Sequence, residues 1–79
     1  MDEQQKHIIE ILVEDAVLWE RTAEDLEYLA NSIPHEPSRR EALARAAWYR
    51  QHAADRRSVA ERMKQEAAAD EQPALTSTT

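Results

Sequence analysis

Residues 8–19 read Ile-Ile-Glu-Ile-Leu-Val-Glu-Asp-Ala-Val-Leu-Trp, and nine of these twelve residues are apolar. On a helix these apolar positions lie around most of the circumference rather than along one stripe. A helix that is apolar all round is either buried or covered by a partner. The stretch therefore predicts a helix with more apolar surface than one neighbouring helix can cover.

The stretch lies inside a longer helical pattern, which predicts a first helix from about residue 3 to residue 32. Asp2 is placed to cap the start of this helix, with Gln5 three residues on as its partner. Apolar residues then recur in alternating steps of three and four, as in the seam of a coiled coil. The members of this seam are Ile9, Leu12, Ala16, Trp19, Ala23, Leu26, Ala30 and Ile33.

A second helix is predicted from residue 39 to about residue 68. Pro34 disfavours helical backbone at Ile33, so the first helix should end by residue 32. Ser38 followed by Glu41 is typical of a capping box, which would start the second helix. The expected apolar face of this helix consists of Ala42, Leu43, Ala46, Tyr49, Ala53, Ala60 and Met63, flanked by Trp48 and Val59.

These two helices predict an all-α fold, an antiparallel two-helix hairpin, because a short connection makes consecutive helices antiparallel neighbours. The hairpin domain is expected to cover residues 1–69. Residues 70–79 lack periodicity and are expected to form a disordered tail. Two such hairpins could also dimerise into a four-helix bundle.

The charges of the two halves differ in sign. Residues 1–33 carry nine acidic and two basic residues, a net charge of −7, whereas residues 34–66 carry five acidic and eight basic residues, a net charge of +3. Opposite signs favour closure of the hairpin over association of like helices. Folding the chain about its loop places Trp19 near His52 and Asp15 near Arg56.

Composition excludes several classes of protein. The chain has 79 residues, no cysteine and no glycine, so disulfide frameworks, thiolate metal sites and glycine-rich phosphate loops are absent. The apolar run is shorter than the roughly 20 residues that span a bilayer, and it carries Glu10, Glu14 and Asp15. The N-terminus is acidic, unlike a signal peptide. We therefore expect a soluble, cytoplasmic protein with no membrane contact.

Catalysis has little support in the sequence. Ser32, Ser38 and Ser58 have no histidine and carboxylate at a spacing that would activate a serine nucleophile. A two-helix hairpin also offers no deep pocket for a substrate. We expect the chain not to be an enzyme and to need no cofactor.

The three histidines suggest no strong metal site. His7 and Glu10 are three residues apart on the first helix, but di-iron bundles use Glu-x-x-His, and here the order is reversed. We therefore predict no metal site and a solvated face instead. His52 should pack beside Trp19, where its protonation could make assembly sensitive to pH, and His35 should be solvated in the loop.

The basic second helix contains Trp48 and Tyr49 among its arginines, a combination that can bind nucleic acid. The chain as a whole has a net charge of −6, however, and several arginines should face the acidic first helix. We expect no direct contact with DNA or RNA. The acidic helix instead favours a basic protein surface, such as that of a DNA-binding regulator.

The apolar surplus predicts a protein-binding surface. The second helix is too narrow to cover Ile8, Ile11, Val13, Val17 and Leu18 together, and two interpretations remain open: self-association, or a docking surface for a different protein. The predicted hydrophobic anchors are Ile8, Ile11, Leu12, Val17, Leu18 and Trp19, and the predicted steering carboxylates are Glu10, Glu14, Glu20 and Glu24.

An acidic, glycine-free helical hairpin with an apolar surplus at residues 8–19 resembles the TraM- and QseM-like antiactivators of bacterial quorum sensing. Those small helical proteins bind LuxR-type transcriptional activators and stop them acting on DNA. The resemblance covers about residues 3–68, in architecture and charge, and implies an inhibitor that sequesters a transcriptional regulator. Phage-type inhibitors and antitoxins share these features, and a homodimeric structural scaffold is the alternative.

Overall fold

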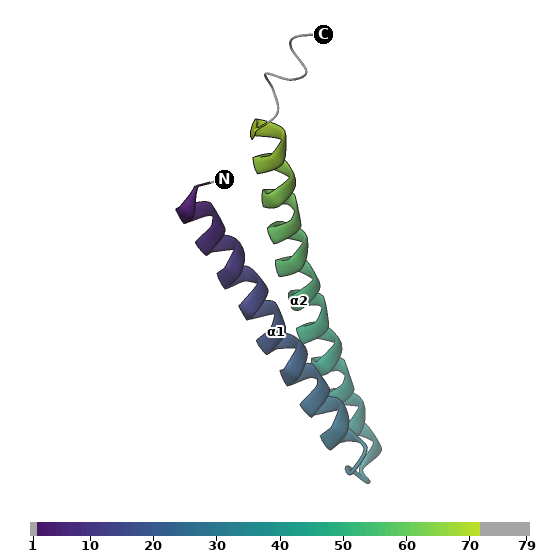
Figure 1. The fold of residues 1–79 in the computed structure, drawn as a ribbon. Helices are drawn as coiled ribbons and strands as arrows, with labels where there is room; N and C mark the ends of the chain where they lie inside the picture. Colours follow the sequence, from purple (N-terminus) through teal and green to yellow (C-terminus); the bar gives the residue numbers. More distant parts are fainter. Residues whose placement is uncertain (1, 72–79) are drawn as a thin grey trace.

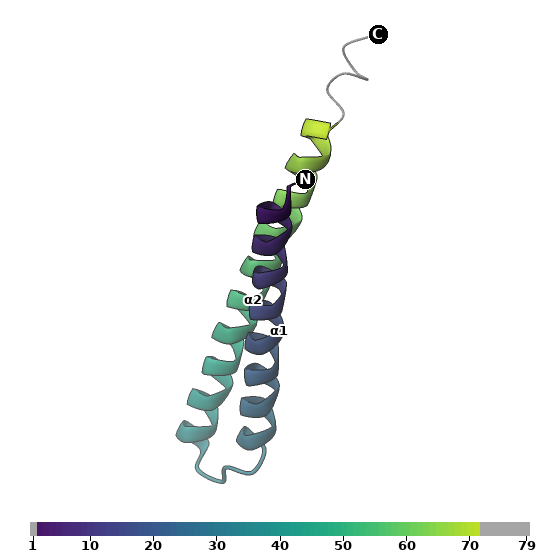
Figure 2. The same ribbon diagram turned by 60° about the vertical axis from the view of Figure 1, so that its left-hand side comes forward.

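The computed structural model describes residues 2–71, and these form two helices that lie side by side in opposite directions (Figure 1). Helix α1 spans Glu3–Ala30 and helix α2 spans Glu36–Glu71. The predicted all-α hairpin is confirmed. The longer α2 continues past the N-terminus of α1 (Figure 2).

Helix α2 ends at Glu71 rather than at about residue 68. Asp70 is therefore helical, and the boundary that we predicted between residues 69 and 70 falls inside α2. The rest of the predicted tail, residues 72–79, lies outside the described residues. So does Met1.

The start of α1 has the predicted cap. The Gln5 amide donates a hydrogen bond to Oδ1 of Asp2 at 2.7 Å, and the Asp2 amide donates one to Oε1 of Gln5 at 3.2 Å. These reciprocal bonds satisfy two amides that have no partner within the helix.

Helix α1 ends at Ala30, two residues before the predicted end. The amides of Ser32 and Ile33 donate to the carbonyls of Leu29 and Ala30 at 3.0 and 3.1 Å. These bonds span three residues rather than four, so the chain tightens into a turn before it reaches Pro34.

The predicted start of α2 at residue 39 is wrong, because the helix begins at Glu36. The His35 carbonyl accepts a hydrogen bond from the Arg39 amide at 3.0 Å, which closes the first turn. Pro37 fits within that turn because its missing N–H would have had no helical partner there.

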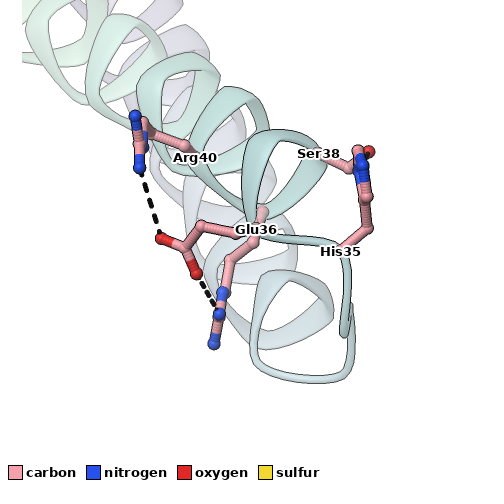
Figure 3. A network of polar contacts seen from close by, with 5 residues as sticks. His35, Glu36, Ser38 and Arg40 are labelled. Atoms are coloured by element: carbon pink, nitrogen blue, oxygen red, sulfur yellow. Dashed lines mark hydrogen bonds and ion pairs between the residues drawn. The ribbon is translucent and has the colours of Figure 1, made fainter.

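The capping box predicted at Ser38 is also wrong, because this residue is already helical. Its hydroxyl lies 2.8 Å from Nδ1 of His35 instead. Next to this contact, the carboxylate of Glu36 binds Arg39 and lies 3.6 Å from Nη2 of Arg40 (Figure 3). Side-chain contacts of the first turn therefore take the place of the predicted box.

The contact between the helices is made by alanines spaced seven residues apart. Because small side chains let helix backbones approach closely, these positions form a continuous stripe, which we call the alanine stripe. No large side chain within residues 2–71 is fully buried. The buried residues are Ile9, Ala16, Ala23 and Ala30 of α1 and Ala46, Ala53, Ala60 and Ala67 of α2.

The alanine stripe is only half of the predicted seam of α1. The other half, made of the larger residues, is half-buried: Leu12, Trp19, Leu26 and Ile33. On α2, Leu43 is 44% exposed although we predicted it on the packing face, because it lies seven residues before Arg50 on a flank of the stripe. Ala67 is buried but was not predicted.

The hairpin is one layer of helices. It consists of α1 and α2 side by side, and its Cα atoms span 65 × 24 × 12 Å, with the smallest extent across the layer. Domains are normally built from two packed layers that enclose a core of large side chains. Within the described residues, neither helix is both long and apolar enough to cross a membrane.

Candidate protein-binding surface

The alanine stripe separates two sides of different chemistry. Residues seven apart stay on one strip of a helix, and the interhelical contacts given below show which strips face each other. The ion-pair side carries Glu20, Glu27, Arg50 and Arg57. The apolar side carries the exposed Ile8, Ile11, Leu18, Leu29 and Trp48, beside the half-buried Leu12, Trp19, Leu26, Tyr49, His52 and Val59.

The ion-pair side joins the helices by two bidentate pairs. Arg50 binds Glu27 through Nε and Nη2 at 2.9 and 2.6 Å, and Arg57 binds Glu20 through the same atoms at the same distances. The predicted pairing of an acidic with a basic helix is therefore confirmed. Because both pairs fix the same antiparallel register, Ala23 comes to lie opposite Ala53.

Trp19 is the centre of an aromatic cluster on the apolar side. Its ring stacks on Tyr49 with centroids 5.0 Å apart and forms a T-shaped pair with Trp48 at 5.8 Å. The predicted proximity of Trp19 and His52 is confirmed, with ring centroids 5.8 Å apart. His52 also stacks on Trp48 at 3.7 Å, and its buried Nδ1 has no hydrogen-bond partner among the described residues.

Asp15 supports this cluster from α1. Its Oδ2 accepts hydrogen bonds from Nε1 of Trp19 and from Nε of Arg56, both at 3.0 Å. The predicted contact between Asp15 and Arg56 is confirmed. The bond from Arg56, followed by that from Trp19, lowers the pKa of the Asp15 carboxyl, so the charged form is held where the two helices meet.

The three interhelical carboxylates predict acid sensitivity. Hydrogen bonds from Arg57 and Arg50 lower the pKa of Glu20 and of Glu27 respectively, below the ordinary value of 4.5, and the pKa of Asp15 lies below 3.8. A carboxyl whose pKa is lower in the folded state stabilises the fold above its unfolded pKa and loses that contribution as the pH falls. We expect the melting temperature to fall as the pH is lowered below 4.5.

Circular dichroism melts between pH 3 and pH 7 measure this effect. The substitution Arg57→Gln should make the melting temperature depend less on pH below 4.5, because Glu20 would then titrate at nearly the same pH in the folded and unfolded states. A melting temperature that stays constant down to pH 3 would contradict the role given to these pairs.

The structure brings most of the predicted anchors together on the apolar side. Leu18 is 60% exposed and Ile11 is 50% exposed, and Ile8 is exposed beside them. Leu12 and Trp19 are half-buried, because they also pack within the hairpin. These five residues therefore form one surface with an exposed outer part and an inner part shared with the fold.

The other predicted site residues lie elsewhere. Val17 is half-buried and shares a strip with Glu10 and Glu24, seven residues away on either side, on the flank toward the ion-pair side. Glu14 is exposed on the outer surface of α1, and Glu20 is held by Arg57. The predicted steering charges are thus separated from the anchors rather than interleaved with them.

Two members of the surface were not predicted as site residues. Leu29 is 56% exposed and Trp48 is 52% exposed. Leu29 follows Ile8 by three heptads, so an extension of the seven-residue repeat beyond residue 19 would have found it. Trp48 could not be assigned to one side without the contact that it makes with Trp19.

The described residues offer fewer features for a small-molecule or metal site. At the end of the hairpin away from the loop there is a shallow groove. Its lining residues are Lys6, Ile9, Glu10, Val13, Glu14 and Lys64. Within residues 2–71, no group of three or more histidine, aspartate or glutamate side chains is placed to hold a metal ion. Comparison of the chain with protein families, with curated proteins and with solved structures finds no match.

Proposed function

We propose that this chain is a non-catalytic protein-binding module that works by packing its apolar side against helices of another protein. The observation that carries the proposal is the exposure of Leu18, Ile11 and Leu29 on the side of the hairpin that also exposes Trp48. Contiguous apolar surface of this kind on a small chain marks an interaction site.

The binding mode that fits this surface is helix packing. Side chains at steps of three and four along α1 enter the grooves of a partner helix, and a few large residues supply most of the binding energy. Leu18 and Ile11 are the exposed anchors. Trp19 packs between the two helices and thereby fixes the position of these anchors on the hairpin. The exposed Glu10, Glu14 and Glu24 lie on other faces of α1 and would speed encounter with a basic partner.

The finer proposal is that the target is a DNA-binding transcriptional regulator, and that this chain inhibits it stoichiometrically. The resemblance to quorum-sensing antiactivators suggests a LuxR-type activator. The net charge of −7 on residues 1–33 supports it, because DNA-binding surfaces are basic. Bound to such a regulator, the acidic α1 would also repel DNA.

A DNA-release assay tests this function. A LuxR-type activator from the organism that encodes the chain is bound to its fluorescent promoter DNA, and the full-length chain is titrated in while anisotropy is followed. We expect complete release of DNA near one equivalent. Leu18→Glu should weaken release at least 100-fold, because it places a charge at the centre of the anchors.

Tyr28→Glu is the matched control. Tyr28 is 75% exposed, lies on the same helix and outside the apolar side, and the substitution adds the same charge. It should release DNA as well as the unmodified chain does. No release at a tenfold excess would contradict the antiactivator function, and equal release by Leu18→Glu would contradict the proposed surface.

A further inference from the structure

We propose that the apolar side is covered by a second copy of this chain, so that two hairpins form a four-helix bundle with their loops at the same end. This inference goes beyond the proposed function, because it concerns the chain in the absence of any target.

The first argument is the lack of a second layer. The Cα atoms of the hairpin extend 12 Å in their shortest direction, and its buried residues are seven alanines and one isoleucine. Apart from Ile9, every apolar side chain larger than alanine remains partly or largely exposed in the described part of the chain. A second hairpin placed on the apolar side supplies the missing layer and encloses the aromatic cluster around Trp19.

The second argument is a second seam on α1. Positions 8, 11, 15, 18, 22, 25 and 29 follow the steps of a heptad repeat, offset from the alanine stripe. Four of them are Ile8, Ile11, Leu18 and Leu29. Thr22 donates its hydroxyl to the Leu18 carbonyl at 3.0 Å, and Asp15 is bonded to α2. Asp15 and Thr22 are therefore satisfied within the chain, as burial under another helix requires. Asp25, the third polar member, is exposed.

The third argument is charge, which selects the orientation. With the loops at the same end, α1 of each copy packs on α2 of the other, and the acidic residues 1–33 face the basic residues 34–66. With the loops at opposite ends, the two acidic helices would pack on each other. Like charges would then line the interface, so the same-end arrangement is favoured.

The same-end arrangement also places apolar residues of the two copies at the same position along the bundle axis. Each copy keeps the register that Glu20–Arg57 and Glu27–Arg50 set within the chain. Leu18 of one copy then comes level with Val59 of the other. Near the loop, Leu29 comes level with Trp48, so an exposed side chain of each helix gains a partner.

The second copy and a target occupy the same side and exclude each other. The two proposals nevertheless fail separately. A chain that stays monomeric could still release DNA from a regulator, and a dimer could form in a chain that binds no regulator.

Spin labels test the arrangement, because the chain contains no cysteine and one introduced cysteine gives one label. Ser32→Cys places a nitroxide in the exposed turn, and Glu3→Cys places one at the start of α1, on the strip of Glu10 and Val17 outside the apolar side. Double electron–electron resonance at 200 µM should give a distance below about 30 Å for each label, since neighbouring helix axes in a bundle lie 8–10 Å apart. Adding Leu18→Glu should abolish both distances, and adding Tyr28→Glu should preserve them.

Two results would overturn the proposal. Distances above about 40 Å for both labels would place the loops at opposite ends, since α1 of 28 residues is about 42 Å long. The absence of any dipolar interaction, with helicity intact by circular dichroism, would show that the chain is monomeric.

Discussion

Replacing Ala53 by leucine is expected to lower the free energy of unfolding by about 1–3 kcal/mol, the usual cost of adding carbons to a closely packed site. Ala53 is 1% exposed and lies opposite Ala23, which is fully buried. The added carbons can be accommodated only by separating the helices, and separation also lengthens the bonds of Arg50 and Arg57. For a domain of this size the melting temperature should fall by about 5–20 °C.

Ala54→Leu provides the matched control, since this alanine is the next residue of α2 and is exposed. It should leave the melting temperature nearly unchanged, because leucine and alanine are both strong helix formers. Melts must be compared at one protein concentration, since association makes the melting temperature depend on concentration. Equal effects of the two substitutions would show that the alanine stripe is not the contact between the helices.

Removal of the Trp19 side chain is the second large perturbation. Trp19→Ala should lower the free energy of unfolding by about 2–3 kcal/mol, below the cost for a fully buried tryptophan because this ring is half-buried. The substitution removes the stacking on Tyr49 and the contacts with Trp48 and His52. It also removes one of the two donors to Asp15.

Trp48→Ala tests whether position rather than aromatic character matters. Trp48 contacts the same cluster, including Tyr49 and His52. It is 52% exposed, however, whereas Trp19 is half-buried, so in dilute solution the loss of Trp48 should cost less than half as much as the loss of Trp19. Urea unfolding followed by circular dichroism measures both. A larger effect of Trp48→Ala under these conditions would contradict the assignment of Trp19 as the central residue of the cluster.

The architecture was largely predictable, because three kinds of signal agree. The steps of three and four from Ile9 to Ala30 define α1, Pro34 disfavours its continuation into the loop, and the opposite charges of the two halves select hairpin closure. Contacts set by register, such as Asp15 with Arg56, follow from folding the chain about its loop. Helix ends were less predictable, since Pro37 is as compatible with a first turn as with a loop.

The division of the surface was not predictable from α1 alone. The pattern identified Ile9, Leu12, Ala16 and Trp19 as one seam, but not that the alanines would carry the contact while the larger residues stay half-buried. This outcome depends on α2, whose alanines at 46, 53, 60 and 67 share the seven-residue spacing. Small residues facing small residues bring the helices together and turn the large residues to one side.

The same division changes the interpretation of the predicted site. Val17 and Leu18 are adjacent and equally apolar in the sequence, yet Leu18 lies on the apolar side and Val17 on the opposite flank. The sequence predicted that Glu20 is an unpaired charge that steers a partner, but its carboxylate forms an ion pair with Arg57. Such distinctions require the position of the second helix, which fixes the direction that each residue of α1 faces.

The central claim is that a second copy of this chain covers the large apolar side chains of the hairpin when no target is bound. Sedimentation equilibrium of the full-length chain between 5 and 500 µM tests it most directly. The account predicts a mass approaching twice the 9.1 kDa of one chain, a 9.1 kDa helical monomer for Leu18→Glu, and an unchanged dimer for Tyr28→Glu. A mass of 9.1 kDa at every concentration, or a Leu18→Glu variant that dimerises as well as the unmodified chain, would contradict it.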